Sequence, residues 1–371
     1  MMNCDIFSGN RIRYRRIQML KYLQAAQFIM DQIRQGELNP NDRLPTENEL
    51  IKTLNMSRKS IRNGMNYLEN QGTIRTVQGS GSYVAAQPRK ETVSNSIAVI
   101  TVFMDEYIFP EKINGLYDVF SSGSCYLSLF STQNRIENEN RILHGLQNGN
   151  FAGIILEATK SALPRADAAI FRKLQEKMPI LMMDSTYKEL NLPSVAMDDT
   201  AGGEMAVSYL LERGHRNILY FGQIDEQQSL DRFRGYLQAL GRRNISFKED
   251  HIFWCTERDA YPEYFEYHRN ELMKQLESCS AAFCCNDQSA ARLIRFLREN
   301  GLSVPDDLSV VSYDDSSIAS GELNLTSVVH PKRELGKKAA ENMLKLLADR
   351  SYDPNYCFTP KLTERGSVKS I

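Results

Sequence analysis

The hydrophobic pattern near the N-terminus predicts three short helices. Between residues 20 and 35, apolar side chains recur every three or four positions, so a helix there has one apolar face. Thr46 and Glu49 match the capping box that opens a second helix, because each side chain can accept a hydrogen bond from the other residue's backbone N–H. Ser57 is the expected N-cap of a third helix, which Gly72 closes.

A hairpin pattern follows these helices. Residues 74–77 and 82–85 flank the turn Gly79-Ser80-Gly81, as the strands of a β-hairpin do. Three helices and a hairpin are the arrangement of a winged helix-turn-helix domain. The polar face of the third helix carries side chains that suit phosphate and base-edge contacts, which are Arg58, Lys59, Ser60, Arg62 and Asn63. The alternative is that these side chains only keep a helix face solvated.

From residue 97 the pattern changes to short apolar runs that alternate with amphipathic helices. The expected strands are residues 97–102, 126–131, 153–156, 180–183, 217–222, 281–284 and 308–312. The expected helices include residues 200–212, 230–240, 264–276 and 288–299. Apolar strands separated by helices are typical of parallel sheets built from βαβ units. The sequence therefore predicts a doubly wound α/β body behind the winged helix.

Charge divides the chain in the same place. Residues 1–90 contain 14 Lys and Arg against 7 Asp and Glu, whereas residues 91–371 contain 31 against 39. A basic head on an acidic body is expected to meet a polyanion, although a chance imbalance is the alternative. The expected segments are an N-terminal extension (1–19), a DNA-binding domain (20–85), a polar linker (86–96) and the body (97–371). The extension is either a basic arm on DNA or the product of a misplaced start codon.

The composition excludes several classes of protein. Hydrophobic residues make up 42% and charged residues 25%, which is ordinary for a globular chain, and no apolar run approaches the roughly 18 residues of a membrane span. Seven cysteines without paired spacing are interpreted as reduced thiols in a cytoplasmic protein. The histidines are scattered and the usual catalytic motifs are missing, so we expect no metal site, no cofactor and no enzyme activity.

Polar and aromatic side chains cluster just after the expected strands of the body. Ligands of such sheets bind at the carboxyl ends of the strands. Carboxylates, amides and a guanidinium beside aromatic rings suit a neutral polyhydroxyl ligand, because planar groups bond vicinal hydroxyls and rings stack on C–H faces. The candidates are Tyr107, Phe109, Glu157, Lys160, Asp184, Arg232, Asn286 and Asp314. Asp199 and Asp287 have a plainer alternative as N-caps of the following helices.

Four ordered motifs near the N-terminus closely resemble the GntR-type DNA-binding domain. They lie at residues 43–50, 56–62, 72 and 78–84. In that family the start of the second helix, the recognition helix and the tip of the wing contact the operator. The resemblance therefore implies operator contacts from Lys21, Arg43, Thr46, Glu47, Ser57, Arg58, Lys59, Ser60, Arg62, Gly79, Ser80 and Gly81. Asn41 stands where the family usually has Gly, so a looser turn is expected there.

Six motifs of the body, in order, resemble the effector domain of the LacI/GalR family. They lie at residues 195–203, 210–218, 232–236, 285–290, 304–315 and 325–328. The resemblance implies two lobes like those of periplasmic sugar-binding proteins, an effector in the cleft between them, and a homodimer on a near-palindromic, double-stranded operator. It also implies that Arg232, Asn286 and Asp314 bind ligand hydroxyls, while Asp184 and His330 match ligand-facing positions more loosely.

A GntR-type head on a LacI-type body is an unusual pairing. Together with residues 105–110 and 157–162, it resembles a branch of sugar-responsive repressors whose effector is a pentose. The resemblance implies a repressor that the sugar releases from its operator, with Lys160 as a donor to a sugar hydroxyl. The alternative ligands are a different sugar, a purine or a phosphosugar, although a phosphosugar calls for more cations than Arg232 and Lys160. An enzyme acting on a small carbohydrate is the alternative class.

Overall fold

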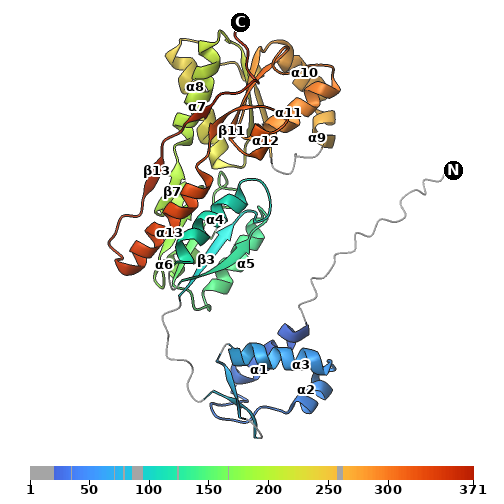
Figure 1. The fold of residues 1–371 in the computed structure, drawn as a ribbon, viewed down its shortest axis with the longest axis vertical. Coiled ribbons are helices and arrows are strands. Elements are labelled where there is room, and N and C mark those ends of the chain that lie inside the picture. Colours follow the sequence, from blue (N-terminus) through green and yellow to red (C-terminus); the bar gives the residue numbers. More distant parts are fainter. Residues whose placement is uncertain are drawn as a thin grey trace, which may run out of the picture. The chain divides into compact units, whose positions relative to one another are not determined.

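The computed structural model forms two units, Met1–Thr92 and Val93–Ile371 (Figure 1). It describes residues 21–34, 36–70, 72–77, 80–85, 95–122, 125–165, 167–256 and 262–371. The expected N-terminal extension lies outside the described residues, and so does most of the expected linker. Among the helices of these described ranges, none has the length and apolar character needed to cross a membrane.

The N-terminal unit contains three helices and a two-stranded hairpin. The helices are α1 (Lys21–Arg34), α2 (Glu47–Leu54) and α3 (Arg58–Asn70), and β1 (Ile74–Val77) pairs antiparallel with β2 (Gly81–Val84). The capping box forms, since the Thr46 side chain accepts from the Glu49 N–H and the Glu49 carboxylate accepts from the Thr46 N–H at 2.7 Å. Ile29, Leu50 and Ile61 are buried at the centre. The predicted winged helix-turn-helix is confirmed.

The second unit contains two lobes, each built on a six-stranded sheet. In lobe 1 the strand order is β13-β7-β6-β5-β3-β4, and all neighbours are parallel. Its strands are β3 (Ser96–Thr101), β4 (Tyr126–Ser131), β5 (Gly153–Leu156), β6 (Ile180–Met183), β7 (Ser194–Met197) and β13 (Tyr356–Phe358). Helices α4 (Phe109–Phe120) and α13 (Lys332–Ala348) cover one face, while α5 (Ile136–Leu146) and α6 (Ala168–Gln175) cover the other. A short η1 (Lys188–Leu190) precedes β7.

Lobe 2 has the strand order β14-β12-β11-β10-β8-β9, in which only β14 is antiparallel to its neighbour. Its strands are β8 (Ile218–Gln223), β9 (Ile252–Cys255), β10 (Ala281–Cys284), β11 (Ser309–Asp314), β12 (Thr326–Val329) and β14 (Leu362–Thr363). Helices α7 (Asp199–Glu212) and α8 (Gln227–Arg242) cover one face. The other elements are η2 (Glu249–His251), α9 (Pro262–Tyr267), α10 (Arg269–Glu277), α11 (Asp287–Glu299) and α12 (Ser317–Ser320).

The chain crosses between the lobes three times. It does so after β7, after β12 and after β13, because the element that follows each of these strands belongs to the other lobe. β7 and β13 pair side by side and both lead from lobe 1 toward lobe 2 (Figure 1). Two doubly wound lobes joined by three segments confirm the predicted fold class.

The observed elements differ from the sequence expectation in two respects. The expected helix at residues 264–276 is two helices, α9 and α10, which are interrupted at His268 (φ −94°, ψ 10°) without a Gly or Pro to signal the break. The strands β7, β9, β12, β13 and β14 were not predicted. They have two to four residues each. A segment of this length shows no clear period of two, and the predicted strands of four residues were recognised instead as apolar runs between helical patterns.

Glycines bring two helices of lobe 1 into backbone contact. A Cβ at Gly115 of α4 would lie 2.1 Å from the carbonyl oxygen of Arg333 in α13, and a Cβ at Gly336 of α13 would lie 2.1 Å from the carbonyl oxygen of Lys112. Only glycine fits at such distances. The close approach fixes α4, the helix that carries Lys112, against α13.

In lobe 2, glycines likewise bring α7 and α8 into backbone contact. A Cβ at Gly203 would lie 2.2 Å from the carbonyl oxygen of Arg232, and a Cβ at Gly235 would lie 2.1 Å from that of Thr200. In each lobe, glycines therefore hold two helices in backbone contact. One helix of each pair carries a buried cation, Lys112 in α4 and Arg232 in α8.

Candidate functional site

The N-terminal unit presents an exposed, cationic face on α3. Arg58 and Lys59 are exposed, and Nη2 of Arg58 donates to Oδ1 of Asn48 at 2.8 Å. Arg62 forms a two-point ion pair with Glu47, with Nε–Oε1 at 3.1 Å and Nη2–Oε2 at 3.3 Å. These contacts link the start of α2 to α3 and hold the guanidinium groups at the surface. The exposed cations of Arg58 and Lys59 can neutralise phosphates of a duplex, whereas that of Arg62 is paired with Glu47.

Serine hydroxyl groups cap the N-terminus of α3, the helix that carries these cations. Ser57 Oγ accepts from the Ser60 N–H at 3.2 Å and bonds Ser60 Oγ at 2.9 Å, so α3 begins with a side-chain cap. Lys21 begins α1, but its side chain lies outside the described part of the unit. Gly79 also lies outside it.

The hairpin and the turn before α2 pack on each other. The backbone of Arg43 forms an isolated antiparallel β-bridge with that of Tyr83 in β2, and Ser80 Oγ bonds the Tyr83 hydroxyl at 2.7 Å. Gly81 has φ +119°, and a Cβ there would lie 3.0 Å from Nε of Arg43. The expectation of a looser turn at Asn41 is wrong. Asn41 itself takes the left-handed conformation (φ 72°) that glycine would supply, as asparagine tolerates, and its N–H donates to the Val84 carbonyl at 3.0 Å.

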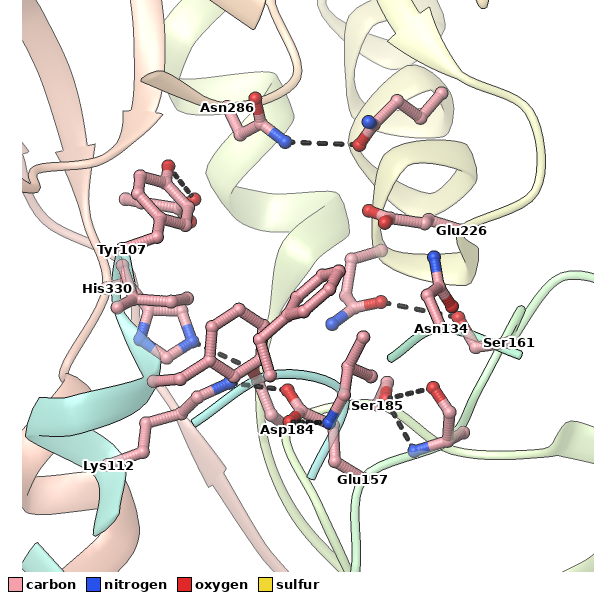
Figure 2. Close-up of a pocket in the computed structure, with 18 of the residues that line it drawn as sticks. Tyr107, Lys112, Asn134, Glu157, Ser161, Asp184, Ser185, Glu226, Asn286 and His330 are labelled. Atoms are coloured by element: carbon pink, nitrogen blue, oxygen red, sulfur yellow. Dashed lines mark hydrogen bonds and ion pairs between the residues drawn. The ribbon is translucent and has the colours of Figure 1, made fainter. Parts of the chain in front are cut away.

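A cleft lies between the two lobes, at the carboxyl ends of the strands (Figure 2). It offers about 90 Å³ to the centres of water molecules, where one water needs about 10–15 Å³. The cleft therefore has room for several waters or a small ligand. The structure places all nine predicted effector residues around it, namely Tyr107, Phe109, Glu157, Lys160, Asp184, Arg232, Asn286, Asp314 and His330.

The wall of the cleft on lobe 1 is a buried charge cluster around Lys112 (Figure 2). Nζ of Lys112 donates to Oδ2 of Asp184 at 2.7 Å and to the Glu157 carboxylate, and it lies 4.3 Å from the centre of the Phe109 ring. Nε2 of His330 lies 2.8 Å from Oδ1 of Asp184. Burial alone would raise the pKa of Asp184, but His330 and Lys112 outweigh it and hold that pKa well below its usual range. Burial raises the pKa of Glu157 against the pull of Lys112.

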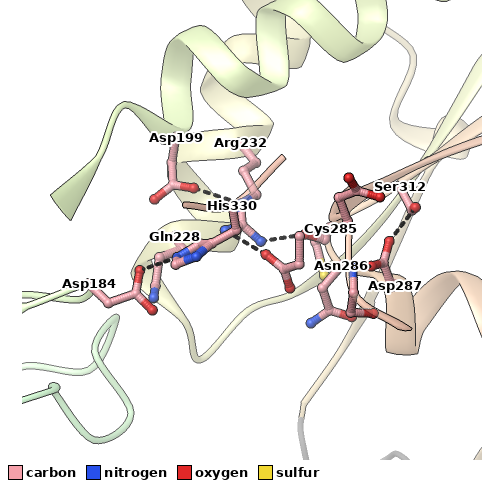
Figure 3. A network of polar contacts seen from close by, with 12 residues as sticks. Asp184, Asp199, Gln228, Arg232, Cys285, Asn286, Asp287, Ser312 and His330 are labelled. Atoms are coloured by element: carbon pink, nitrogen blue, oxygen red, sulfur yellow. Dashed lines mark hydrogen bonds and ion pairs between the residues drawn. The ribbon is translucent and has the colours of Figure 1, made fainter. Parts of the chain in front are cut away.

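The wall on lobe 2 is organised by Arg232 (Figure 3). Its Nε donates to Oδ1 of Asp199 at 2.8 Å and its Nη1 donates to the Cys285 carbonyl at 2.5 Å. Its Nη2 lies 3.5 Å from Oδ1 of Asp314, and the guanidinium lies 3.6 Å from the centre of the Tyr313 ring. Burial raises the pKa of Asp199 to about 6, although Arg232 opposes this. Arg232 is thus held from two sides with one nitrogen directed toward Asp314.

Two aspartates that the sequence allowed as helix caps do not cap. Asp198, not Asp199, caps α7 by accepting from the Ala201 N–H at 2.9 Å. Asn286 caps α11 by accepting from the Ser289 N–H at 2.8 Å, while its Nδ2 donates to Gln223 Oε1 at 3.1 Å. Asp287 accepts hydrogen bonds from three groups around the end of the sheet, which are Ser312 Oγ, the Ser316 N–H and Ser327 Oγ. Burial raises the pKa of Asp287 to about 6.

Five residues of the cleft adopt the left-handed backbone conformation. They are Tyr107 (φ 57°), Asn134 (φ 50°), Lys160 (φ 49°), Asp184 (φ 67°) and Asp314 (φ 100°). Such a conformation costs a residue other than glycine about 1–3 kcal/mol and is concentrated at functional sites. The buried Lys332 stabilises the strained backbone of Asp314, because its Nζ donates to the Asp314 carbonyl at 2.6 Å.

Tyr107 connects the two walls of the cleft. Its hydroxyl, from lobe 1, donates to Oδ2 of Asp314 at 2.5 Å and accepts from the Asp287 N–H at 3.2 Å, both in lobe 2. Burial is the main cause that raises the pKa of this tyrosine. The hydroxyl therefore stays protonated and can donate.

Two buried polar atoms at the cleft find no hydrogen-bond partner within the described ranges. They are Oδ1 of Asp314 and Nδ1 of His330, and both residues line the cleft. An unsatisfied buried polar group costs about 1–3 kcal/mol, so a ligand that bonds it recovers that free energy. A hydroxyl group can both donate to Asp314 and bond His330.

Lys112 is the main cleft residue that the sequence motifs did not indicate. It lies three residues after Phe109 and four before the buried Leu116, on the face of α4 that packs on the sheet. A lysine on an otherwise apolar helix face is the signal that could have identified it, because a buried lysine needs a carboxylate partner.

Metal ligands do not gather around the cleft. Within the described ranges, no group of three or more His, Cys, Asp or Glu side chains is arranged to hold an ion. The described cysteines carry free thiols, and burial raises the pKa of Cys284 and Cys285, which pack next to each other at the end of β10.

Both units match families of known proteins. Residues 21–84 match the bacterial regulatory proteins of the gntR family, and residues 207–368 match the periplasmic binding protein-like domain. A solved complex of the transcriptional regulator CelR with cellobiose superimposes with a TM-score of 0.65 at 20% identity, over 84% of this chain and 91% of that one. A LacI family regulator from Enterococcus faecium with bound ribose gives a TM-score of 0.63 at 22% identity, over 74% and 99%. These structures share the fold.

Curated relatives match along nearly the whole chain. The arabinose metabolism transcriptional repressor of Geobacillus stearothermophilus is 32% identical over 357 residues, which are 95% of this chain and 98% of the relative. The protein of the same name from Halalkalibacterium halodurans is 33% identical, over 94% and 96%. The chain therefore belongs to the family of arabinose metabolism transcriptional repressors, in which a GntR-type DNA-binding domain is joined to a LacI-type effector domain.

Proposed function

We propose that this repressor binds L-arabinose in the cleft and that the sugar weakens its hold on the operator. The observation that carries the proposal is a pair of buried atoms at the cleft that have no hydrogen-bond partner among the described residues, Oδ1 of Asp314 (3.5 Å from Nη2 of Arg232) and Nδ1 of His330. They belong to two positions that the LacI resemblance implied as ligand-facing. Vicinal hydroxyls of a pentose would satisfy both, and the names of the relatives support arabinose among the pentoses.

The charge balance of the cleft favours a neutral sugar over a phosphosugar. Lys112 is already paired with Glu157 and Asp184, and Arg232 with Asp199. A phosphate group would bring further negative charge beside these carboxylates without an unpaired cation from Lys112 or Arg232 to meet it. A phosphosugar is therefore disfavoured, and we propose that the chain acts by binding alone.

On DNA, we propose that α3 enters the major groove. Arg58 and Lys59 would contact base edges and phosphates, while the hairpin with Ser80 and Gly81 would lie along the backbone. Arg58, Lys59 and Ser80 are exposed, which supports the assignment. We place the protein in the cytoplasm, where it meets operator DNA.

Two copies are expected on a near-palindromic operator. The support is an apolar surface on α4 and β4, where Tyr117, Tyr126 and Leu129 are 61%, 74% and 42% exposed. β4 is the edge strand of its sheet, and a large exposed apolar patch at a sheet edge is typical of a protein interface. We assign this surface to a second copy of the chain. Leu129→Asp should shift sedimentation of the full chain from dimer to monomer, and an unchanged dimer would refute this surface.

Coupling between the cleft and the DNA would come from movement of the lobes. A sugar that binds the closed form better favours closure by that difference in affinity. A typical coupling of about 1–3 kcal/mol weakens DNA binding about 5- to 150-fold. That range is sufficient for derepression.

Titration calorimetry of the full chain tests the ligand. L-arabinose, D-xylose, D-galactose and a pentose phosphate are titrated separately, and we expect saturable heat with L-arabinose at the lowest concentration. His330→Ala removes one of the two unsatisfied groups and should weaken that binding. Tighter binding of the phosphate, or no heat with any neutral sugar, would reject the proposed ligand.

A further inference from the structure

A second set of contacts joins the lobes on the side of the cleft that lies away from His330, where Figure 2 shows Ser161 and Glu226. Nζ of Lys160 in lobe 1 forms an ion pair with the Asp225 carboxylate of lobe 2. The Asp225 carbonyl accepts from the Ala162 N–H at 3.3 Å. We call these groups, together with Ser161 and Gln227, the rim contact.

Ser161 caps a helix of the opposite lobe. Gln227 is the first residue of α8, so its N–H has no acceptor within the helix. That N–H donates to Oγ of Ser161 at 2.8 Å. The hydrogen bond exists only while the lobes are together, and it links the loop of Lys160 to the helix that carries Arg232.

The charged pair of the rim contact is largely removed from water. The side chains of Lys160 and Asp225 are 14% and 7% exposed, and Oδ1 of Asp225 has no hydrogen-bond partner in the described parts of the body. Each partner belongs to a different lobe, so separation of the lobes exposes both charges to solvent. The pair therefore affects closure of the cleft and not the folding of either lobe.

Lobe 1 holds Lys160 in place before it meets its partner. Its backbone is left-handed (φ 49°), and its N–H donates to Oδ1 of Asn134 at 3.1 Å. The preceding Thr159 is fixed as well, with its N–H donating to Oε2 of the buried Glu139 at 3.0 Å. These contacts all lie within lobe 1, so the ammonium group is presented toward lobe 2 at little further entropic cost.

We propose that Lys160 and Asp225 are positioning residues. They set how readily the cleft closes, and so the sugar concentration at which the repressor responds, without donating to the sugar. The inference rests on the proposed function in one respect, since it takes closure to accompany sugar binding. It differs from the role implied by the sequence, in which Lys160 donates to a sugar hydroxyl.

Three variants of the full chain separate the two roles. Lys160→Met removes the cation that faces the buried Asp225 in the closed form, and Asp225→Asn removes the Asp225 charge that faces Lys160. We expect each to weaken L-arabinose binding about tenfold or more, because the measured affinity falls with the closed fraction. The double variant removes both charges of the pair, so it should be weakened by less than the product of the two single effects.

A direct role in sugar binding gives a different pattern. In that case Lys160→Met weakens binding, Asp225→Asn does not, and the double variant behaves as Lys160→Met does. That pattern would overturn the proposal. Lys173→Met, which removes an exposed lysine of α6, is the matched control and should leave the affinity unchanged.

Hydrogen exchange of the full chain without sugar provides a second readout. Within the described part of the body, the amides of Ala162 and Gln227 donate to acceptors of the rim contact, so their exchange should accelerate in both single variants. Unchanged exchange would overturn the proposal whatever the sugar does. If the unmodified chain binds no L-arabinose but the exchange accelerates as expected, the proposed ligand fails while the rim contact stands.

Discussion

The DNA-binding face and the cleft hold their cations in opposite ways. Arg58 and Lys59 are exposed on α3, where Arg58 donates to Asn48 of the neighbouring helix α2. Lys112 and Arg232 are buried, and each is fixed by two hydrogen-bond acceptors and an aromatic ring. Exposed cations attract a polyanion at long range and in a salt-dependent way. Buried, paired cations contribute fixed geometry, which is what recognition of an uncharged sugar requires.

The first prediction concerns the exposed side of this comparison. Arg58→Ala should reduce operator binding to the non-specific level, which is about 1,000-fold weaker or more, because the contact to base edges is lost. Sugar binding should not change. Fluorescence anisotropy with an operator selected from random duplexes measures the loss. Lys52→Ala, which removes an exposed lysine of α2 outside the predicted face, is the control. An equal loss in both variants would show that overall charge, and not contact with base edges, determines the operator affinity.

For the buried cations of the cleft we expect the opposite pattern, in which sugar binding is weakened and operator binding is kept. Arg232→Met should weaken L-arabinose binding about 100-fold, since hydrogen bonds to a charged group contribute about 1.5–3 kcal/mol each. Operator binding should be retained, so the variant represses whether or not sugar is present. Arg234→Met, on the same helix with a side chain 53% exposed, should respond normally. On the same samples, calorimetry measures the affinity for L-arabinose and anisotropy measures the affinity for the operator.

Burial also predicts an unusual pH dependence of stability. The pKa of Asp199 is raised to about 6, so between about pH 4 and pH 6 the folded chain binds a proton that the unfolded chain has lost. The contribution of Asp199 to stability therefore falls as pH rises through this window, by up to about 3 kcal/mol. Asp199→Asn should flatten that part of the profile of unfolding free energy against pH. Glu212→Gln, exposed at the end of the same helix, should not, and an equal slope in all three proteins would contradict the assignment.

The fixed geometry of the cleft depends on the helix contacts behind it. Gly235→Ala places a Cβ against the Thr200 carbonyl and should cost about 2 kcal/mol of stability, as overpacking does. Gly241 lies on the same helix with open space around it, so Gly241→Ala should stabilise the body by about 0.5–1 kcal/mol. Scanning calorimetry compares the two, and a Gly235→Ala variant as stable as the parent would show that the two helices can separate freely.

The two regions also differ in how far the sequence predicts them. The winged helix follows from local signals, such as the capping box at Thr46 and the apolar stripe that buries Ile61. The cleft is assembled from residues as far apart as Tyr107 and Asp314. Eight of its nine predicted residues were indicated by their place near the ends of expected strands, and His330 by the motif resemblance alone. The Lys112 cluster and the Lys160–Asp225 pair were not predicted, because their partners lie 45 to 72 residues away and are brought near only by packing. The cap at Asn286 instead of Asp287 differs from the expectation by a single residue, which sequence spacing alone does not resolve.

The coupling of the two regions is tested most directly by operator affinity of the full chain, measured by anisotropy without sugar and with saturating L-arabinose. We predict that the sugar weakens operator binding about 5- to 150-fold. At the lowest L-arabinose concentration that saturates the unmodified chain, Arg232→Met should show little of this change while binding the sugar-free operator normally. An affinity that stays the same or rises with L-arabinose would contradict it.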